Sequence, residues 1–207
     1  MTLPTKLTCL RIVLTFVIMG LLFVPGPQAK AAALGLFLFA AATDWLDGEL
    51  ARRWGQTSPL GALLDPIADK VLVLGLFLAF VQLRLLPAWM VLVIALREFL
   101  ITGVRLFAAS RQVILSAAKE GKHKTVSQMV TIFVVLAVML AKEWAPLPGL
   151  SPEMARLLDW TVRGCLLVTL VLTVASGTTF FWRHRTVLAQ RHRKTEEEPI
   201  TPQKHRE

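Results

Sequence analysis

Six apolar stretches, most of them close to the length that crosses a bilayer, follow one another along the chain with short polar connections between them. A transmembrane helix needs roughly 20 mostly apolar residues, and inside the hydrocarbon core only helices and closed barrels satisfy their own backbone hydrogen bonds. The stretches cover residues 12–24, 31–46, 60–83, 88–107, 126–141 and 157–182, and the second continues as a helical pattern to residue 54. The sequence therefore predicts an all-α, polytopic integral membrane protein with about six transmembrane helices forming one domain, residues 1–182.

Composition agrees with this class and excludes others. Hydrophobic residues make up 55% of the chain and charged residues 18%, whereas soluble domains average about 45–50% and 25%. An ordinary soluble enzyme, a disordered chain and a disulfide-stapled secreted domain are excluded. Nucleic acid is not an expected partner, because no soluble domain remains to bind it. Cys9 and Cys165 lie in or beside apolar stretches, as inert membrane thiols do.

The basic residues predict the orientation of the chain. Eight of them fall before the first stretch or in the connections after the second and fourth: Lys6, Arg11, Arg52, Arg53, Arg111, Lys119, Lys122 and Lys124. The opposite connections hold only Lys30, Arg84, Lys142 and Arg156. By the positive-inside rule both termini are cytoplasmic. Much of the net charge of +9 is thus explained by topology.

The two ends of the chain leave alternatives open. The first apolar stretch could be a signal peptide cleaved near residues 29–31, but a second long stretch follows at once, which favours an uncleaved span. Residues 183–207 are highly charged, and this composition predicts a disordered cytoplasmic tail. Its basic part would serve as a solvated topology anchor or bind anionic lipid.

Four carboxylates stand where the membrane makes them costly: Asp44, Asp47, Asp65 and Asp69. The first pair is spaced i, i+3 and the second i, i+4, so each pair lies on one helix face. A short connection joins the two helices, and the four carboxylates can therefore converge. Acidic residues at membrane depth are rare and mark functional sites by default.

Four converging negative charges would not all stay ionised without compensation. A cation among them, protonation of some of them, or pairing with Arg52 or Arg53 would each relieve the repulsion. All-oxygen ligands favour magnesium, manganese or calcium over zinc. Structural ion pairs without chemistry are the alternative, but folding alone rarely needs so many carboxylates in one patch. Between the acids stand Gly48, Ala51 and Gly61, which either permit close helix packing or leave room for a ligand.

The acids and small residues together form a known pattern. From Asp44 to Asp69 the chain matches D-x2-D-G-x2-A-R-x8-G-x3-D-x3-D at every fixed position and gap, and so resembles the CDP-alcohol phosphotransferases. Their six-helix topology resembles the one predicted here, so the resemblance covers nearly the whole chain except the tail. Members transfer a phosphatidyl or similar group from a CDP-linked donor to an alcohol and release CMP.

The resemblance implies a role for each matched residue. Asp44, Asp47, Asp65 and Asp69 would hold one or two magnesium or manganese ions, two being expected, against the donor diphosphate. Asp69 would also be the catalytic base that takes the proton of the acceptor hydroxyl. Four residues would accommodate the donor nucleotide and diphosphate: Gly48, Ala51, Arg52 and Gly61. Arg52 would clamp a phosphate, for which its planar donors are suited.

The flanking segments favour one acceptor. Residues 3–11, Leu96-Arg97-Glu98 and residues 121–129 resemble segments of bacterial phosphatidylglycerophosphate synthases, which implies CDP-diacylglycerol as donor and glycerol 3-phosphate as acceptor. Arg97, Arg105 and Lys124 are candidates for binding the acceptor phosphate. Arg97 could instead pair with Glu98, and Lys124 could be a topology charge.

Other functions are also compatible with the sequence. Another acceptor of the same reaction (inositol phosphate, serine or phosphatidylglycerol) is the nearest alternative. A cation channel or transporter would need charges along a path through the bilayer, whereas here they crowd near one surface. The resemblance also implies a homodimer.

Overall fold

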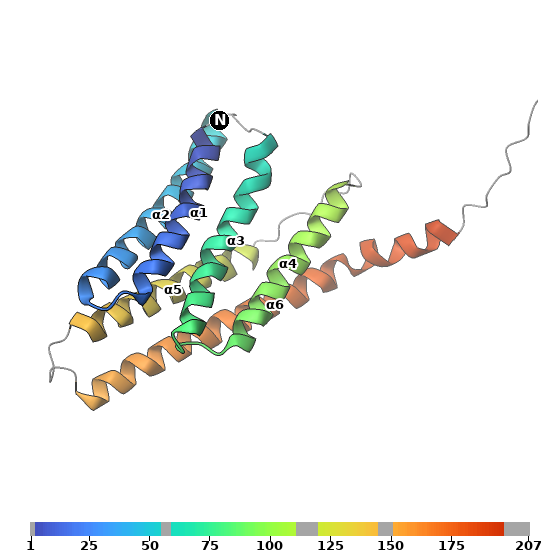
Figure 1. The fold of residues 1–207 in the computed structure, drawn as a ribbon. Helices are drawn as coiled ribbons and strands as arrows, with labels where there is room; N and C mark the ends of the chain where they lie inside the picture. The colour runs from blue at the N-terminus through green and yellow to red at the C-terminus, as the bar shows by residue number, and fades with distance from the viewer. Residues whose placement is uncertain (1–2, 55–58, 111–119, 145–150, 197–207) are drawn as a thin grey trace, which may run out of the picture.

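The computed structural model describes residues 3–54, 59–110, 120–144 and 151–196, which form six helices and no strand within those ranges. In chain order they are α1 (Leu3–Phe23), α2 (Pro27–Trp54), α3 (Pro59–Gln82), α4 (Ala88–Ser110), α5 (Glu120–Trp144) and α6 (Pro152–Glu196). Figure 1 shows α1, α2 and α3 as one group and the long α6 running beneath α4.

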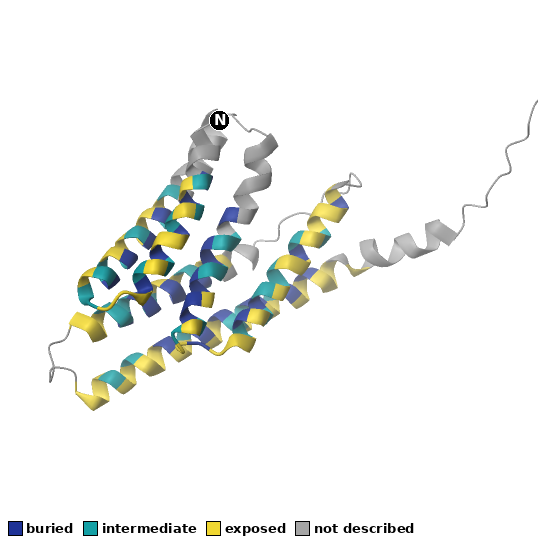
Figure 2. Ribbon diagram, viewed as in Figure 1, coloured by how far each residue is buried: buried dark blue, intermediate teal, exposed yellow. Residues whose placement is uncertain are grey.

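The third helix is the centre of the bundle. It packs against α1, α4 and α5. Helix α2 packs on both α1 and α5. Its middle is fully buried, with Leu72, Leu76, Phe77 and Phe80 all inaccessible (Figure 2). Large apolar side chains on the outer faces of α4 and α6 are exposed instead. Exposed apolar faces of this extent are typical of a surface that meets lipid or another protein.

The predicted all-α class and the six apolar stretches agree with the observed helices, and breakers mark their limits. Pro27, Pro59 and Pro152 begin helices, and Pro87 directly precedes one, because proline is tolerated in the first turn. Two helical stretches in the described part are long and apolar enough to cross a membrane, Thr125–Trp144 and Pro152–Arg183. Thr8–Phe23 and Lys70–Gln82 are shorter apolar stretches. The number of spans therefore stays a prediction.

The beginning of the charged tail differs from the expectation. Its composition predicts disorder from Arg183 on, but α6 continues to Glu196. The physical reason lies in the residues themselves. Segment 186–194 is rich in leucine, alanine, glutamine, arginine and lysine, which are good helix formers, and no proline occurs between Pro152 and Pro199. Residues 197–207 lie outside the described part.

A buried lysine fastens the turn between α1 and α2. Lys30 donates from Nζ to the carbonyls of Leu22 (2.9 Å) and Val24 (2.6 Å), which the end of α1 leaves without helical partners. Glu143 of α5 accepts from the backbone N–H of Gly26 (2.8 Å) and lies 3.7 Å from Lys30 Nζ. Lys30 is only 5% exposed, so it is not the solvated loop charge that the topology pattern implied.

Hydroxyl groups join α5 to α6 inside the bundle. Thr131 and Thr169 share a hydrogen bond of 2.8 Å between their hydroxyls, and Thr169 also donates to the backbone carbonyl of Ser127 (3.0 Å). Both threonines are buried. Interhelical hydrogen bonds of this kind hold helices together where the hydrophobic effect between them is weak.

Candidate active site

The acidic pattern occupies the end of one helix and the beginning of the next. Asp44 and Asp47 lie within the second half of α2, and Asp65 and Asp69 within the first half of α3. Both helices are continuous there, so the helical geometry that the i, i+3 and i, i+4 spacings require is confirmed. The end of α2 and the beginning of α3 lie beside the beginning of α1 (Figure 1).

The side chains of the acidic pattern fall outside the described part. This applies to the four aspartates and to Gly48, Ala51, Arg52 and Gly61. Within the described part no cluster of three or more metal-ligating side chains occurs. The side chains of the four aspartates lie outside that part, so the metal site predicted on them stays a prediction. Their donor chemistry fits a hard divalent cation, since magnesium prefers carboxylate oxygens.

A basic residue that the sequence placed among the topology charges lies inside the protein at this end. Arg11 of α1 is 3% exposed and follows Thr8, which is also buried, by one turn. A fully buried guanidinium needs compensation by acceptors or negative charge. Arg11 is therefore a component of the interior beside the acidic helices, not a solvated loop charge. The signal in the sequence was a single charge directly at the start of an apolar stretch.

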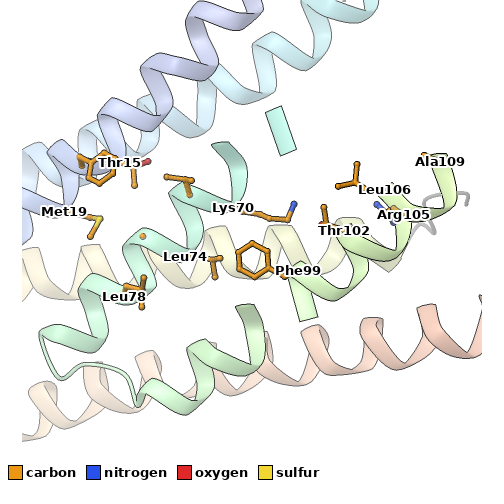
Figure 3. A pocket seen from close by; sticks show the side chains of 13 residues that line it. Thr15, Met19, Lys70, Leu74, Leu78, Phe99, Thr102, Arg105, Leu106 and Ala109 are labelled. Carbon is orange, nitrogen blue, oxygen red and sulfur yellow. The ribbon is translucent and has the colours of Figure 1, made fainter. Parts of the chain in front are cut away.

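A groove of about 800 Å³ opens between α1, α3 and α4, and we call it the α1/α3/α4 groove. Most of its lining is apolar, with Met19, Leu74, Leu78, Phe99 and Leu106 among the side chains. Figure 3 shows the polar groups gathered toward one end, where Lys70 reaches from α3 toward Thr102 and Arg105 of α4. The groove therefore has a cationic end and an apolar body.

Arg105 is one of the three basic residues expected at the acceptor phosphate. It lies at the cationic end of the groove, and its guanidinium stacks over the ring of Phe180 of α6 at 5.6 Å from the centroid. A cation held over an aromatic face keeps its position while its N–H groups stay available for an anion. Lys70, directly after Asp69, lines the same end. The groove thus begins one residue from the predicted base.

Arg97 lies in a different setting. It donates from Nη1 to Glu98 (3.1 Å) and from Nη2 to the hydroxyl of Ser176 on α6 (2.9 Å), and Gly177 provides the space for its side chain, because a Cβ there would stand 3.1 Å from Arg97 Cγ. The ion pair that the sequence left open as an alternative is present. Arg97 does not line the groove in which Arg105 lies, so the structure separates two residues that the sequence grouped.

The third acceptor candidate, Lys124, lies in the second turn of α5. Its side chain is outside the described part, so its predicted contact with a phosphate stays a prediction. Gln128, one turn further along α5, is buried, and its amide nitrogen has no hydrogen-bond partner among the residues that the structure describes.

Comparisons with known proteins add independent information. Residues 1–175 match the family model described as CDP-alcohol phosphatidyltransferase. A protein of Bacillus subtilis named CDP-diacylglycerol–glycerol-3-phosphate 3-phosphatidyltransferase is 36% identical over 191 residues, which cover 86% of this chain and 93% of the relative.

Two other relatives match shorter parts. A protein of the same name from Cereibacter sphaeroides is 38% identical over 138 residues, 65% of this chain and 62% of the relative. A CMP-forming cardiolipin synthase of Oryza sativa is 37% identical over 151 residues, 66% of this chain and 46% of the relative. Their names say that these proteins act on CDP-diacylglycerol and glycerol 3-phosphate in the first case, and form cardiolipin and CMP in the second.

Proposed function

Because the chain belongs to the CDP-alcohol phosphatidyltransferase family, we propose that it transfers the phosphatidyl group of CDP-diacylglycerol to glycerol 3-phosphate, yielding phosphatidylglycerophosphate and CMP. The observation that carries this proposal is the 36% identity to a relative of that name over 93% of the relative's length. The complete acidic pattern on α2 and α3 supports the same chemistry.

The reaction needs one proton transfer and one substitution at phosphorus. The acceptor hydroxyl oxygen forms a bond to the phosphorus that carries the diacylglycerol, and the bond from that phosphorus to the CMP oxygen breaks. The hydroxyl proton passes to the Asp69 carboxylate, which acts as general base. A carboxylate is suited to this role because the hydroxyl loses its proton as the new bond forms, while CMP leaves as an anion.

Divalent metal is expected to neutralise the anionic leaving group. Asp44, Asp47, Asp65 and Asp69 would hold magnesium or manganese, and the resemblance to the family implies two ions. The chemistry supplied by the bound ions is charge stabilisation at the diphosphate. Gly48, Ala51 and Gly61 would leave space for the cytidine and its phosphates, and Arg52 would bind one phosphate.

The acceptor phosphate is expected at the cationic end of the groove. Arg105 is the strongest candidate, because stacking on Phe180 fixes its guanidinium and no carboxylate lines the groove within the described part. Lys124 stays a second candidate. Arg97 is the weakest of the three, since its Nη1 and Nη2 groups already donate to Glu98 and Ser176.

Phosphatidylglycerol as acceptor is the second candidate function. The similarity to a CMP-forming cardiolipin synthase over 151 residues favours it over serine or inositol phosphate. That relative is matched over only 46% of its length, whereas the Bacillus subtilis protein is matched over almost all of its length. Glycerol 3-phosphate is therefore proposed as the acceptor.

The expected setting is the inner membrane of a bacterium. Six spans with both termini in the cytoplasm would bring the acidic pattern to the cytoplasmic surface, where water-soluble glycerol 3-phosphate and membrane-borne donor meet. The exposed apolar faces of α4 and α6 support contact with lipid or with a second copy in a homodimer.

Purified protein in detergent, supplied with magnesium, CDP-dioleoylglycerol and labelled glycerol 3-phosphate, tests the proposal. We expect CMP release and incorporation of label into lipid in equal amounts. Asp69→Asn should lower kcat by at least about a hundredfold, because general-base catalysis contributes about 10²–10⁴ in rate, with little change in donor binding. Absence of CMP release from the unmodified protein under these conditions contradicts the proposed reaction, and full activity of Asp69→Asn contradicts the role of Asp69.

A further inference from the structure

We propose that the α1/α3/α4 groove binds one acyl chain of the CDP-diacylglycerol donor, with Lys70 facing the anionic part of the lipid and Arg105 beside it left to the acceptor phosphate. This inference rests on the proposed function and extends it to the part of the donor that does not react. The observations that carry it are the groove's shape, the placement of its charges and its opening to the molecular surface.

The volume and the length of the groove fit a chain. Its 800 Å³ lies within the range of about 300–1,000 Å³ that is usual for small-molecule sites. On α3 the lining residues run from Lys70 to Leu78, a distance of about 12 Å at a rise of about 1.5 Å per residue. The groove thus extends from the cationic end toward the middle of α3.

The walls of the groove are chemically those of a hydrocarbon site. Between the two cations and Leu78 the lining is aliphatic or aromatic, apart from the hydroxyls of Thr15 and Thr102. The Thr15 hydroxyl donates to the carbonyl of Arg11 in its own helix (2.9 Å), and its methyl carbon faces Gly75, where an added Cβ would stand only 2.9 Å away. Glycine at this position lets α1 and α3 approach closely and form the floor.

The charges select the polarity of the ligand. Lys70 and Arg105 converge at one end (Figure 3), and no acidic side chain lines the groove within the described part. An amphiphile with an anionic group at the cationic end and a chain along the apolar body complements both regions. Lys70 follows Asp69 directly in the chain, so this end of the groove lies beside the proposed active site. The lipid whose phosphates are expected at that site is the donor.

The groove is open to its surroundings. Phe16, Leu78, Phe99 and Leu106 are all more than half exposed although they line it. A lipid could therefore enter sideways from the bilayer. Its position follows from helix packing, because α4 is tied to α6 by the Arg97–Ser176 hydrogen bond and the stacking of Arg105 on Phe180.

Binding in such a groove has a particular energetic consequence. A chain that moves from bilayer to groove leaves one hydrocarbon environment for another, so the hydrophobic effect contributes little and packing decides the fit. Affinity should then come from the charged end, while the body of the groove determines which chains fit. Blocking the body should change chain-length selectivity rather than abolish turnover with every donor.

Two tryptophan substitutions with matched controls test this. Leu78→Trp blocks the end of the groove furthest from the cations, and Leu106→Trp blocks it next to Arg105. Leu92→Trp and Leu100→Trp on α4 are the controls, because these leucines have similar exposure (58% and 55%, against 57% and 59%) and do not line the groove.

Each variant is assayed with the dioleoyl and the dihexanoyl forms of CDP-diacylglycerol. We expect Leu78→Trp to lower kcat/KM for the dioleoyl donor by about fivefold or more, since overpacking a filled site is costly, and to leave the dihexanoyl donor within about twofold, because its chains end before Leu78. Leu106→Trp should impair both donors, and the controls neither. Equal losses for both donors with Leu78→Trp, or losses with the controls, overturn the proposal.

A second measurement does not depend on turnover. A CDP-diacylglycerol with a photoreactive diazirine on one acyl chain is illuminated with the unmodified protein, and the adducts are mapped by mass spectrometry. Adducts at Met19, Leu74 or Leu78 support the groove even if no CMP is released, so failure of the proposed reaction and failure of this inference are distinguishable. Adducts elsewhere, or equal labelling of the groove by a diazirine phosphatidylcholine, contradict donor binding.

Discussion

Replacing Lys30 with methionine should destabilise the protein without changing its chemistry. Lys30 Nζ donates to two carbonyls at the end of α1, at 2.9 Å and 2.6 Å. A hydrogen bond that involves a charged group contributes about 1.5–3 kcal/mol, and removing the buried ammonium returns part of its desolvation cost. We expect a net loss of about 2–4 kcal/mol of unfolding free energy.

The carboxylate beside Lys30 should matter less. Glu143 is about one-third exposed and 3.7 Å from Lys30 Nζ, so the ion pair is worth at most about 1 kcal/mol. Glu143→Gln also keeps an oxygen that can accept from the Gly26 N–H. Lys142→Met is the matched control, because Lys142 pairs with Asp159 at 2.6 Å while both side chains are well exposed, and we expect a change of less than about 1 kcal/mol.

Thermal unfolding in detergent, followed by circular dichroism, measures the three variants. At about 2–4 °C per kcal/mol for a chain of this size, Lys30→Met should lower the midpoint by roughly 4–16 °C, and the other two by a few degrees at most. CMP release at 25 °C should stay near that of the unmodified protein, because Lys30 lies at the turn between α1 and α2, away from the acidic pattern. A midpoint of Lys30→Met equal to that of Lys142→Met would refute the buried cap.

Three further predictions concern other contacts. Arg84 has φ 58° in the turn after α3, where the Arg84 N–H donates to the Val81 carbonyl and the Leu85 N–H donates to the Phe80 carbonyl. Arg84→Gly should raise the unfolding free energy by up to about 1 kcal/mol, since glycine adopts this backbone conformation freely. A lower thermal midpoint of this variant would contradict the prediction. Gly164→Ala should stabilise α6 by up to about 1 kcal/mol, whereas Gly177→Ala should not, because its Cβ meets Arg97 at 3.1 Å; equal midpoints of the two variants argue against the close approach. Thr169→Val should lower the unfolding free energy by about 1–2 kcal/mol, because it removes the hydroxyl that bonds to Thr131 and to the Ser127 carbonyl. Denaturant unfolding measures this loss, and an unchanged midpoint would contradict the polar contact between α5 and α6.

The helices were predictable because the apolar stretches are long and their ends carry proline. Pro25-Gly26-Pro27, Pro59, Pro87 and Pro152 all lie at or beside a helix limit, and the acidic spacings define a helix face without knowledge of the fold. The helix beyond Arg183 was missed, because charge density predicts solvation and not the absence of helix. Helical propensity in segment 186–194 was the available signal.

The surroundings of single basic residues could not be predicted. A lysine or arginine near the end of a membrane helix can extend to water or turn inward to carbonyls and carboxylates, and the two outcomes have the same local sequence. Lys30 and Arg11 turn inward, and Arg97 and Arg105, eight residues apart on α4, reach different partners. The α1/α3/α4 groove depends on how α4 packs against α6. This is a tertiary contact, and the periodicity of apolar residues in the sequence does not encode it.

The identity of the lipid product tests the central claim most directly. Purified protein is given magnesium, CDP-dioleoylglycerol and an equimolar mixture of glycerol 3-phosphate, inositol phosphate, serine and phosphatidylglycerol, and the products are resolved by mass spectrometry. The proposed function predicts phosphatidylglycerophosphate as the dominant lipid, formed in equal amount to CMP and lost in Asp69→Asn. Cardiolipin or another phosphatidyl product in its place would contradict glycerol 3-phosphate as the acceptor, and the absence of any new lipid would contradict the transferase itself.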